Sequence, residues 1–439
     1  MLLRQLVDDD LGCACYLIGD EEGGEAVIVD PPYEIDPLLA EAERAGIRPT
    51  RVLETHTHAD HLSGHGRLAL EQGLSVCVHS AAGAEYPHEP LQDGDEIEVG
   101  SVRIRVLHTP GHRPEHCCFL AGDALMTGDS LFVGAAARPD LAVKAREGAE
   151  GLFHSLQRLS ELPDDVRVLP GHVAGSLCGT GMTGERSSSI GHERRFNPAL
   201  ALATVEEFVA ESASVSTPRP PNMERIVDLN RGPFVGAATP LEKVGSANGA
   251  TVLDVRSEDA FAASHVPGAL SVPVSGSTFG TKAGFLLRPD EHVVLHASSP
   301  EEAGLAAHRL YAVGFLEQVD GYLTDVTTTE ALEPIGIEEL DLLLTDDAVL
   351  LLDVREKDEH DDGYIPGSRN IPYRLLRATA HDLPTGRPVV TICESGARAG
   401  VAASVLVAAG VPARPLLHGG VHDLEALGHQ TVAFRRCGS

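Results

Sequence analysis

An apolar strand that runs directly into a cluster of histidines and acids constrains this chain more than any other feature. The strand Arg51–Leu53 is followed by Glu54-Thr55-His56-Thr57-His58-Ala59-Asp60-His61, which places four potential metal ligands within six residues. In open α/β sheets, ligand sites form in the loops just past the strand ends. The motif therefore predicts a metal site at the edge of a sheet.

Three later residues extend this set of potential ligands. His112 in Thr-Pro-Gly-His, Asp129 in Thr-Gly-Asp and His172 in Pro-Gly-His each follow an apolar stretch and lie on a glycine-containing turn. Glycine permits the sharp backbone geometry that such a turn needs. A single histidine is more often a core or surface residue than a ligand, but this many in strand-end loops strongly favour a metal centre. The full set could hold two zinc ions, whereas His56, His112 and Asp129 alone would form the two-histidine, one-carboxylate face that suits non-heme Fe(II) and O2.

Short apolar strands and a few helices alternate in the first half of the chain. Helices are expected over Asp36–Ala45 and Gly151–Leu162, the second with an apolar stripe at helical spacing. Strand pairs without crossover helices near residues 95–130 favour a mixed sheet, so an αββα sandwich is expected. The predicted strands are Ala26–Val29, Arg51–Leu53, Ser75–Val78, Val102–Leu107 and Val166–Leu169.

The HxHxDH motif with the later His, Asp and His resembles the metallo-β-lactamase fold, over residues 1–211. The ending Arg138-x-Asp140 and the segment Gly171–Glu193 resemble the multidomain bacterial persulfide dioxygenases. This resemblance implies one Fe(II) per chain. The implied iron ligands are His56, His112 and Asp129, and the implied second-shell or second-metal residues are His58, Asp60, His61 and His172.

The resemblance implies oxidation of a small-molecule thiol persulfide: R–S–S⁻ + O2 + H2O → R–SH + sulfite. A three-ligand site leaves positions for the terminal sulfur and for O2, and iron supplies electrons that zinc cannot. The alternative is a zinc-dependent thioester hydrolase of the glyoxalase II kind, with Zn²⁺ at this site and accessory rhodanese domains.

An internal repeat follows a Ser/Thr/Pro-rich linker over residues 212–222. Val252–Pro273 and Leu351–Pro372 share their LDVR and PG elements, and each is followed by an apolar strand, a loop and a helix. Copies of about 100 residues are too long for a solenoid unit and are typical of tandem α/β domains. Two doubly wound domains are therefore expected, over residues 223–330 and 335–437.

The second copy carries a cysteine at a strand-to-helix turn. Val389–Ile392 leads into Cys393-Glu394-Ser395-Gly396-Ala397-Arg398, and the backbone N–H groups and helix start at such a turn favour a thiolate. The second copy resembles a rhodanese domain, which implies that Cys393 carries a sulfane sulfur as a persulfide. Arg398, Gly396, Ser395 and Glu394 would bind the substrate, with Arg398 gripping an anion in a bidentate manner. Glu394 disfavours thiosulfate as donor, and a thiol persulfide or the metal domain's own product is the alternative.

The first copy lacks this nucleophile. Alignment of Val293–His296 with Val389–Ile392 places Ala297 opposite Cys393, so residues 223–330 resemble an inactive rhodanese copy that serves as a spacer or docking surface. Asp353 and Arg355 are expected to form a structural ion pair. Cys178, in a glycine-rich loop after His172, is a candidate sulfur relay, with an ordinary loop cysteine as the alternative. Five cysteines in strand-like runs are predicted to be core residues: Cys13, Cys15, Cys77, Cys117 and Cys118.

Charge and hydropathy narrow the range of partners. The net charge of −31 disfavours nucleic acid and anionic lipid as partners. No apolar run reaches the roughly 18 residues of a membrane span, and the first ten residues show no secretion signal, so a cytoplasmic location is expected. The expected small-molecule partners are a thiol persulfide, O2, and sulfite or thiosulfate. The carrier thiol and the formation of a homo-oligomer are left open.

Overall fold

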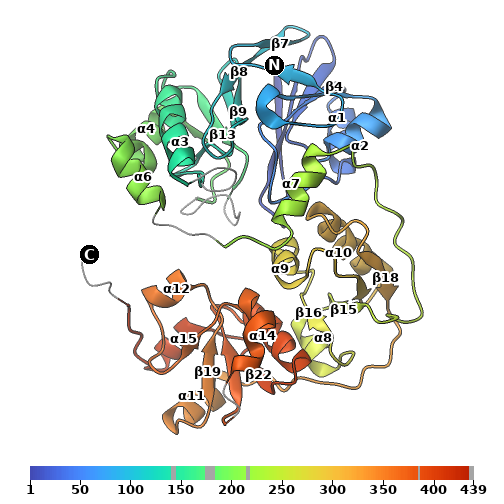
Figure 1. Ribbon diagram of the computed structural model, residues 1–439, viewed down its shortest axis with the longest axis vertical. Coiled ribbons are helices and arrows are strands. Elements are labelled where there is room, and N and C mark those ends of the chain that lie inside the picture. Colours follow the sequence, from blue (N-terminus) through green and yellow to red (C-terminus); the bar gives the residue numbers. More distant parts are fainter. Residues whose placement is uncertain (140–144, 174–182, 214–217, 384–385, 435–439) are drawn as a thin grey trace. The chain divides into compact units, whose positions relative to one another are not determined.

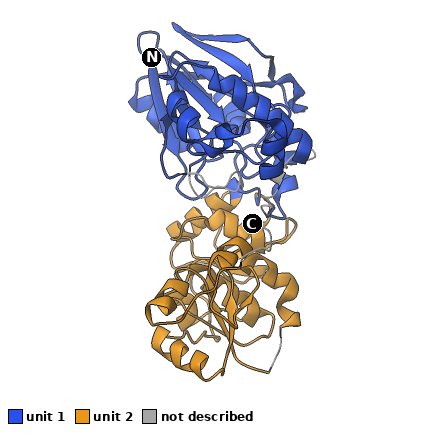
Figure 2. Cartoon of the chain, turned by 90° about the vertical axis from the view of Figure 1, so that its left-hand side faces the viewer, with its two compact units in different colours: residues 1–238, 311–315 blue, residues 239–310, 316–439 orange. Residues whose placement is uncertain are grey.

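The chain folds into two compact units. The computed structural model describes residues 1–139, 145–173, 183–213, 218–383 and 386–434. One unit comprises Met1–Ala238 with Tyr311–Phe315, and the other comprises Thr239–Leu310 with Leu316–Ser439 (Figure 2). Cys178, Asp140 and part of the predicted linker lie outside the described residues. Within the described ranges, no helix is long and apolar enough to cross a membrane.

Two six-stranded sheets and one small hairpin form the frame of the first unit (Figure 1). The first sheet, in spatial order, contains β1 (Leu2–Val7), β2 (Ala14–Gly19), β3 (Glu25–Val29), β4 (Arg48–Leu53), β5 (Ser75–His79) and β6 (Glu89–Leu91). The second contains β14 (Ser188–Ser189), β13 (Arg167–Pro170), β10 (Ala124–Gly128), β9 (Cys117–Ala121), β8 (Val102–His108) and β7 (Glu96–Val99). The hairpin pairs β11 (Leu131–Phe132) with β12 (Ala135–Ala136).

Alternating side chains divide the interior of this unit into three layers. On β2, Tyr16 and Ile18 lie in the core between the sheets with Phe119 of β9. Their neighbours Cys15 and Leu17 lie in the core between the first sheet and its helices. A third core joins the second sheet to the following helices. Because strand residues point alternately to opposite faces, both sheets are covered on both sides, and the predicted αββα sandwich is confirmed.

The helices of the first unit lie close to their predicted positions. The predicted helix Gly151–Leu162 begins earlier than expected, at Ala145, and ends at Ser160, with its apolar stripe buried in the third core. The predicted domain limits stay predictions: 1–211, 212–222, 223–330 and 335–437. The first compact unit runs to Ala238, so it includes residues 223–238, which the sequence analysis assigned to the first repeat. The helices are α1 (Asp36–Arg44), α2 (His65–Gln72), α3 (Ala145–Ser160), α4 (Ile190–Phe196), α5 (Pro198–Ala201), α6 (Val205–Ala213) and α7 (Met223–Arg231).

The second unit contains the two repeats, each built around a four-stranded parallel sheet. The first sheet is β16 (Leu270–Ser271), β15 (Thr251–Asp254), β17 (Val293–His296) and β18 (Val319–Leu323). The second is β20 (Arg369–Asn370), β19 (Leu350–Asp353), β21 (Val389–Ile392) and β22 (Ala413–Pro415). The helices of the first repeat are α8 (Glu258–Ala263), α9 (Phe279–Leu286) and α10 (Pro300–Ala312). Those of the second are α11 (Ile337–Thr345), α12 (Lys357–Asp362), α13 (Leu376–Thr379), α14 (Ala397–Ala408) and α15 (Val421–Ala426).

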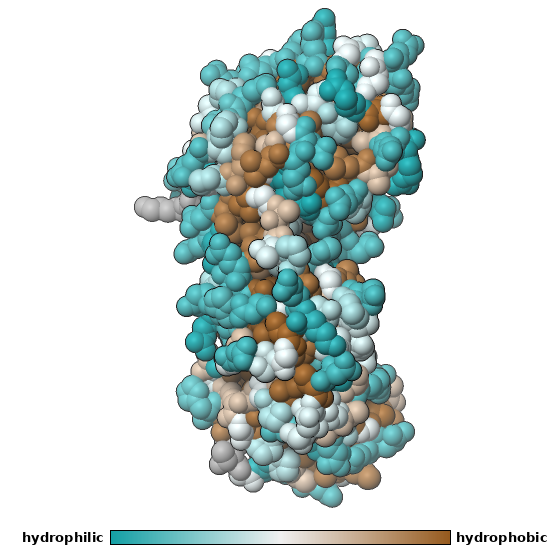
Figure 3. All heavy atoms as spheres, turned by 90° about the vertical axis from the view of Figure 1, so that its right-hand side faces the viewer, coloured by the Kyte–Doolittle hydropathy of each residue, from teal (hydrophilic) through white to brown (hydrophobic). Residues whose placement is uncertain are grey.

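Polar contacts join the two repeats within this unit. The guanidinium of Arg377 forms a forked ion pair with Glu291, at 2.7 and 2.9 Å. The backbone N–H of Ser271 donates to Ser404 Oγ on α14, at 3.0 Å. Helix α14 is therefore packed against the first repeat. On the face shown in Figure 3, hydrophilic side chains are spread widely, as the large net charge leads one to expect.

Candidate metal centre and sulfur-transfer loop

Three donor atoms from three separate loops converge in the first unit. His56 follows β4, His112 follows β8 and Asp129 follows β10. Their Nε2 atoms lie 3.9 Å (His56) and 3.7 Å (His112) from Asp129 Oδ2. All three donor atoms are buried, and none has a hydrogen-bond partner among the described residues. One ligand atom from each of the three residues lies within 4.8 Å of the other two. Because buried polar atoms are almost always paired, three unpaired atoms that converge in this way fit a bound metal ion.

The opposite edges of the two imidazoles are fixed by hydrogen bonds. Thr55 Oγ1 lies 2.9 Å from His56 Nδ1, and the carbonyl oxygen of Arg138 accepts from His112 Nδ1 at 2.9 Å. Thr55 is itself held by Asp30, through both its backbone N–H and its hydroxyl, each at 2.7 Å. Such outer hydrogen bonds set the tautomer and orientation of metal-binding histidines.

Burial and neighbouring charges prepare the three groups for ligation. Burial lowers the pKa of both His56 and His112, which favours the neutral imidazole that a metal requires. Burial by itself would raise the pKa of the Asp129 carboxyl, but the charge and hydrogen bond of His172 hold it well below its usual range. His116 Nε2 accepts the backbone N–H of Asp129 at 3.0 Å, and burial lowers the pKa of His116 to about 3.

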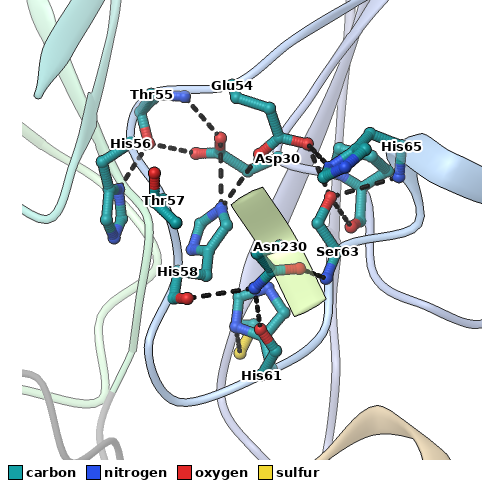
Figure 4. Close-up of polar contacts among 12 residues, drawn as sticks. Asp30, Glu54, Thr55, His56, Thr57, His58, His61, Ser63, His65 and Asn230 are labelled. Atoms are coloured by element: carbon teal, nitrogen blue, oxygen red, sulfur yellow. Dashed lines mark hydrogen bonds and ion pairs between the residues drawn. The ribbon is translucent and has the colours of Figure 1, made fainter. Parts of the chain in front are cut away.

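The second histidine of the motif lies outside this three-donor group. His58 Nε2 lies 3.2 Å from Glu54 Oε2 and 3.4 Å from Asp30 Oδ1 (Figure 4). Although burial opposes its charge, the hydrogen bonds to these two acids raise the pKa of His58 to about 9. His58 therefore faces Glu54 and Asp30, and it is absent from the group formed by His56, His112 and Asp129.

Asp60, His61 and His172 form a second group with Cys13. The Cys13 Sγ atom lies 3.3 Å from His61 Nδ1 and 3.2 Å from His172 Nε2. Cys13 is buried, as predicted for a core residue. The residue precedes β2, and its thiol faces the histidine cluster instead of an apolar layer. Cys15, Cys77, Cys117 and Cys118 do lie in the hydrophobic cores.

A buried asparagine from far along the chain holds the loop that carries the motif. Asn230 on α7 donates from Nδ2 to the carbonyl oxygens of His58 (3.0 Å) and His61 (2.8 Å), and its Oδ1 accepts from the Ser63 backbone N–H at 2.9 Å (Figure 4). Only 3% of Asn230 is exposed. Sequence reasoning missed this residue, because no local pattern connects an asparagine on a polar helix with a loop 167 to 172 residues away.

Asn230→Ala is expected to weaken metal binding by about 10- to 100-fold, the usual range for residues that support metal ligands. The variant leaves two carbonyls and one N–H of the motif loop without their partner, so the loop can shift His61 and its neighbours. Asn222→Ala is the matched control, because Asn222 is equally buried and donates to Val313 O at 2.7 Å. Metal affinity by competition with a chelator should fall only for Asn230→Ala. An equal fall in both variants would assign Asn230 a purely structural role.

The cysteine of the second repeat lies where the sequence predicts, at the turn between β21 and α14. Cys393 is buried, and its Sγ accepts the backbone N–H of Gly396 at 3.1 Å. Gly396 has φ of 95°, and a Cβ there would lie 1.8 Å from the Leu417 carbonyl oxygen, so only glycine fits this turn. Helix α14 begins at this turn without a side-chain cap among the described residues, which leaves its backbone N–H groups available to an anion.

The polar residues around Cys393 are paired in the structure. Arg398 forms a fork with Glu359 at 2.6 and 2.7 Å, so bidentate anion binding by Arg398 stays a prediction that requires an exchange of partner. Glu394 lies 3.2 Å from Arg355 and 2.9 Å from His422 Nε2, which offsets its negative charge, while Ser395 is exposed. The predicted ion pair between Asp353 and Arg355 is present, at 2.8 Å.

The corresponding turn of the first repeat is closed by the chain itself. Ala297 stands at the position of Cys393 and is fully buried. The carboxylate of Glu302 accepts the backbone N–H of Ser298 at 2.6 Å, and Ser299 Oγ accepts the N–H of Glu302 at 3.2 Å. A carboxylate of the chain therefore occupies one backbone N–H of this turn. The inactivity of this copy stays a prediction.

Comparisons with known proteins agree with this architecture. Residues 8–172 match the metallo-beta-lactamase superfamily, and residues 238–322 and 337–427 match the rhodanese-like domain. The chain is 32% identical over 236 residues to the mitochondrial persulfide dioxygenase ETHE1 of Homo sapiens, over 52% of this chain and 87% of the relative. It is 32% identical over 174 residues to the probable polyketide biosynthesis zinc-dependent hydrolase BaeB of Bacillus velezensis, over 38% of this chain and 76% of that protein. A metallo-beta-lactamase from Staphylococcus aureus matches in structure with a TM-score of 0.68 and 28% identity, over 73% of this chain and 98% of that one.

The sandwich and its histidine–carboxylate centre define a metallo-β-lactamase fold protein with two rhodanese-like domains. The metallo-β-lactamase fold and the two rhodanese-like domains were predicted from the sequence, and the family matches confirm them. Within this superfamily, the chain belongs to the family of the persulfide dioxygenase ETHE1.

Proposed function

We propose that the chain is a non-heme Fe(II) persulfide dioxygenase with a coupled sulfurtransferase domain. The first unit oxidises a low-molecular-weight thiol persulfide: R–S–S⁻ + O2 + H2O → R–SH + HSO3⁻. The terminal sulfur is oxidised, O2 is reduced, and the carrier thiol is released. The family relationship to ETHE1 supports this substrate class.

The observation that carries the proposal is the convergence of two imidazoles and one carboxylate whose buried donor atoms have no hydrogen-bond partner among the described residues. His56, His112 and Asp129 are the residues that would hold the iron. When bound, Fe(II) supplies the open coordination positions and the redox chemistry that this ligand set is known to support. The dinuclear zinc alternative would use Asp60, His61 and His172, which lie together in a second group. His58, in contrast, is engaged by Glu54 and Asp30.

The surrounding residues orient the metal ligands and keep a proton on the neighbouring His58 imidazole. Thr55 and the Arg138 carbonyl fix the two ring orientations, and His172 donates from Nδ1 to Asp129 Oδ1 at 2.7 Å. Glu54 and Asp30 hold a proton on His58 Nε2. The buried walls exclude water from these groups, which strengthens each of these polar contacts.

The second repeat would then transfer the sulfane sulfur. The Cys393 thiolate attacks the terminal sulfur of a thiol persulfide, which breaks the S–S bond, releases the carrier thiol and leaves Cys393 as a persulfide. Sulfite from the first unit takes this sulfur as thiosulfate and restores the thiolate. Fusion of two active sites in one chain raises the effective concentration of the shared intermediate.

The test is O2 consumption after addition of glutathione persulfide to anaerobically prepared, Fe(II)-loaded protein. Rapid uptake with the appearance of sulfite or thiosulfate is expected. Iron-loaded protein that consumes no O2 with several persulfides, but hydrolyses thioesters when loaded with zinc, would instead establish the hydrolase. The relationship to BaeB makes this the relevant alternative.

A further inference from the structure

A cavity of about 570 Å³ in the first unit adjoins the loops that carry the donor residues. Two of the residues that line it are Ala59, which lies between His58 and Asp60 in the motif, and Arg113, which directly follows His112. Sites for small molecules usually have volumes of about 300–1,000 Å³. The cavity is therefore large enough for a small substrate and lies beside the donor group.

Helix α7 and the residues just before it supply the rest of the lining. The charged residues of this part are Arg219, Glu224, Asp228 and Arg231. None of these four lies within the segments that match the metallo-beta-lactamase superfamily or the rhodanese-like domain. The cavity therefore depends on the connection between the matched domains, which neither family match contains.

Hydrogen bonds hold this connection against the rest of the first unit. Asn230 Nδ2 on α7 donates to the carbonyl oxygens of His58 and His61 (Figure 4). At the end of α7, the carbonyl oxygen of Arg231 accepts the backbone N–H of Glu85 at 2.7 Å. A wall that is fixed before binding spares the ligand part of the cost of ordering the site.

Side chains of both charges line the cavity. Arg113 is buried, and its Nε donates to Glu115 Oε1 at 2.8 Å, which offsets its charge. The other two arginines and the two acids of the lining are exposed. Guanidinium groups bind carboxylates through paired hydrogen bonds, and the acids can accept from an ammonium group. A ligand that carries only negative charges would be repelled by the two acids, so the lining suits a zwitterion.

We propose that this cavity binds the carrier part of the substrate, and that the carrier is a zwitterionic peptide thiol of the glutathione type. Arg219 and Arg231 bind its carboxylates, and Glu224 and Asp228 bind its ammonium group. The link between this site and the reaction rests on the proposed persulfide oxidation. Because the cavity adjoins the donor loops, the sulfur end of the bound carrier lies beside the donor group.

The test is equilibrium binding of S-methylglutathione to the full-length protein, measured by titration calorimetry. This probe keeps the charged groups of glutathione and has no free thiol, so its binding needs no metal–sulfur bond. Arg219→Gln and Arg231→Gln should each raise its Kd by about 10-fold, the usual effect of losing a hydrogen bond between charged groups. Both side chains are exposed, so both variants should fold. Arg225→Gln is the matched control, because Arg225 lies on the same helix outside the cavity lining, and its Kd should stay unchanged.

Two further probes test the assignment of the charges. Replacing both acids, as Glu224→Gln with Asp228→Asn, should weaken binding of S-methylglutathione but not of its N-acetyl derivative, which lacks the ammonium group. S-methyl coenzyme A, whose negative charges are phosphates, should bind more weakly than S-methylglutathione. If it bound more tightly and lost this affinity in the arginine variants, the zwitterion assignment would be overturned.

The binding site itself is overturned if the unmodified protein does not bind S-methylglutathione, or if Arg219→Gln and Arg231→Gln leave its Kd unchanged. No persulfide is oxidised in these titrations. Oxygen uptake with glutathione persulfide in a protein that fails the binding test would leave the proposed function standing without this site. Binding as expected in a protein that oxidises no persulfide would instead contradict the proposed function.

Discussion

His112→Ala is expected to abolish persulfide-dependent O2 consumption and to spare sulfur transfer at Cys393. The substitution removes one of three donor atoms, leaves His56 and Asp129 with too few partners to hold iron, and opens a cavity beside them. Loss of supporting residues alone costs about 10- to 100-fold in metal affinity or activity, so loss of a ligand should exceed about 100-fold. Oxygen uptake and iron content are measured together, with thiosulfate:thiol sulfurtransferase activity as the second readout.

His154→Ala is the control for this experiment. His154 lies on α3 in the same unit, but its side chain is exposed. It should leave iron content and oxygen uptake unchanged. If His112→Ala kept its iron and its oxygen uptake, the three-donor group would not be the iron site. If it also lost sulfur transfer, the two active sites would not be independent.

The sequence motif places His56, His112 and Asp129 at strand ends, and the structure brings these three side chains together. Their role as metal ligands stays a prediction. The choice of His56 over His58 as a donor came from the resemblance to the persulfide dioxygenases, because the spacing of the motif does not distinguish the two histidines. That choice depends on side-chain orientation, and His58 is turned by Glu54 and by Asp30, which follows a different strand. A spacing pattern contains no information about this orientation.

Contacts between distant segments account for the other features of the structure that the sequence did not predict. Cys13 is buried, as its apolar run predicts, but the sequence does not show that its pairing with His172, 159 residues away, directs the thiol to the histidine cluster. Asn230 reaches the motif loop only because α7 lies against it. In the second repeat, the CxxGxR spacing located Cys393 and Gly396, whereas the Arg398–Glu359 fork depends on how α12 packs beside α14.

Cys393→Ser is expected to abolish sulfur transfer and to leave O2 consumption intact. A hydroxyl at this turn is not ionised at neutral pH and cannot form a persulfide, although it can still accept the N–H of Gly396. Loss of a nucleophile typically costs more than about 10³-fold, so transfer should fall to the background rate. The measurement is the rate of thiosulfate formation from persulfide and sulfite, with oxygen uptake recorded on the same preparation.

Ala297→Ser is the matched control, because it places the same side chain at the same turn of the first repeat. That turn is closed by Glu302, and neither activity should change. Residual transfer in Cys393→Ser would assign the sulfur acceptor to another thiol. The proposed site of persulfide oxidation lies in the first unit, so oxygen uptake by Cys393→Ser should persist even when thiosulfate no longer forms. Sulfite should then accumulate in place of thiosulfate. Loss of both activities in this variant would contradict the division of labour between the units.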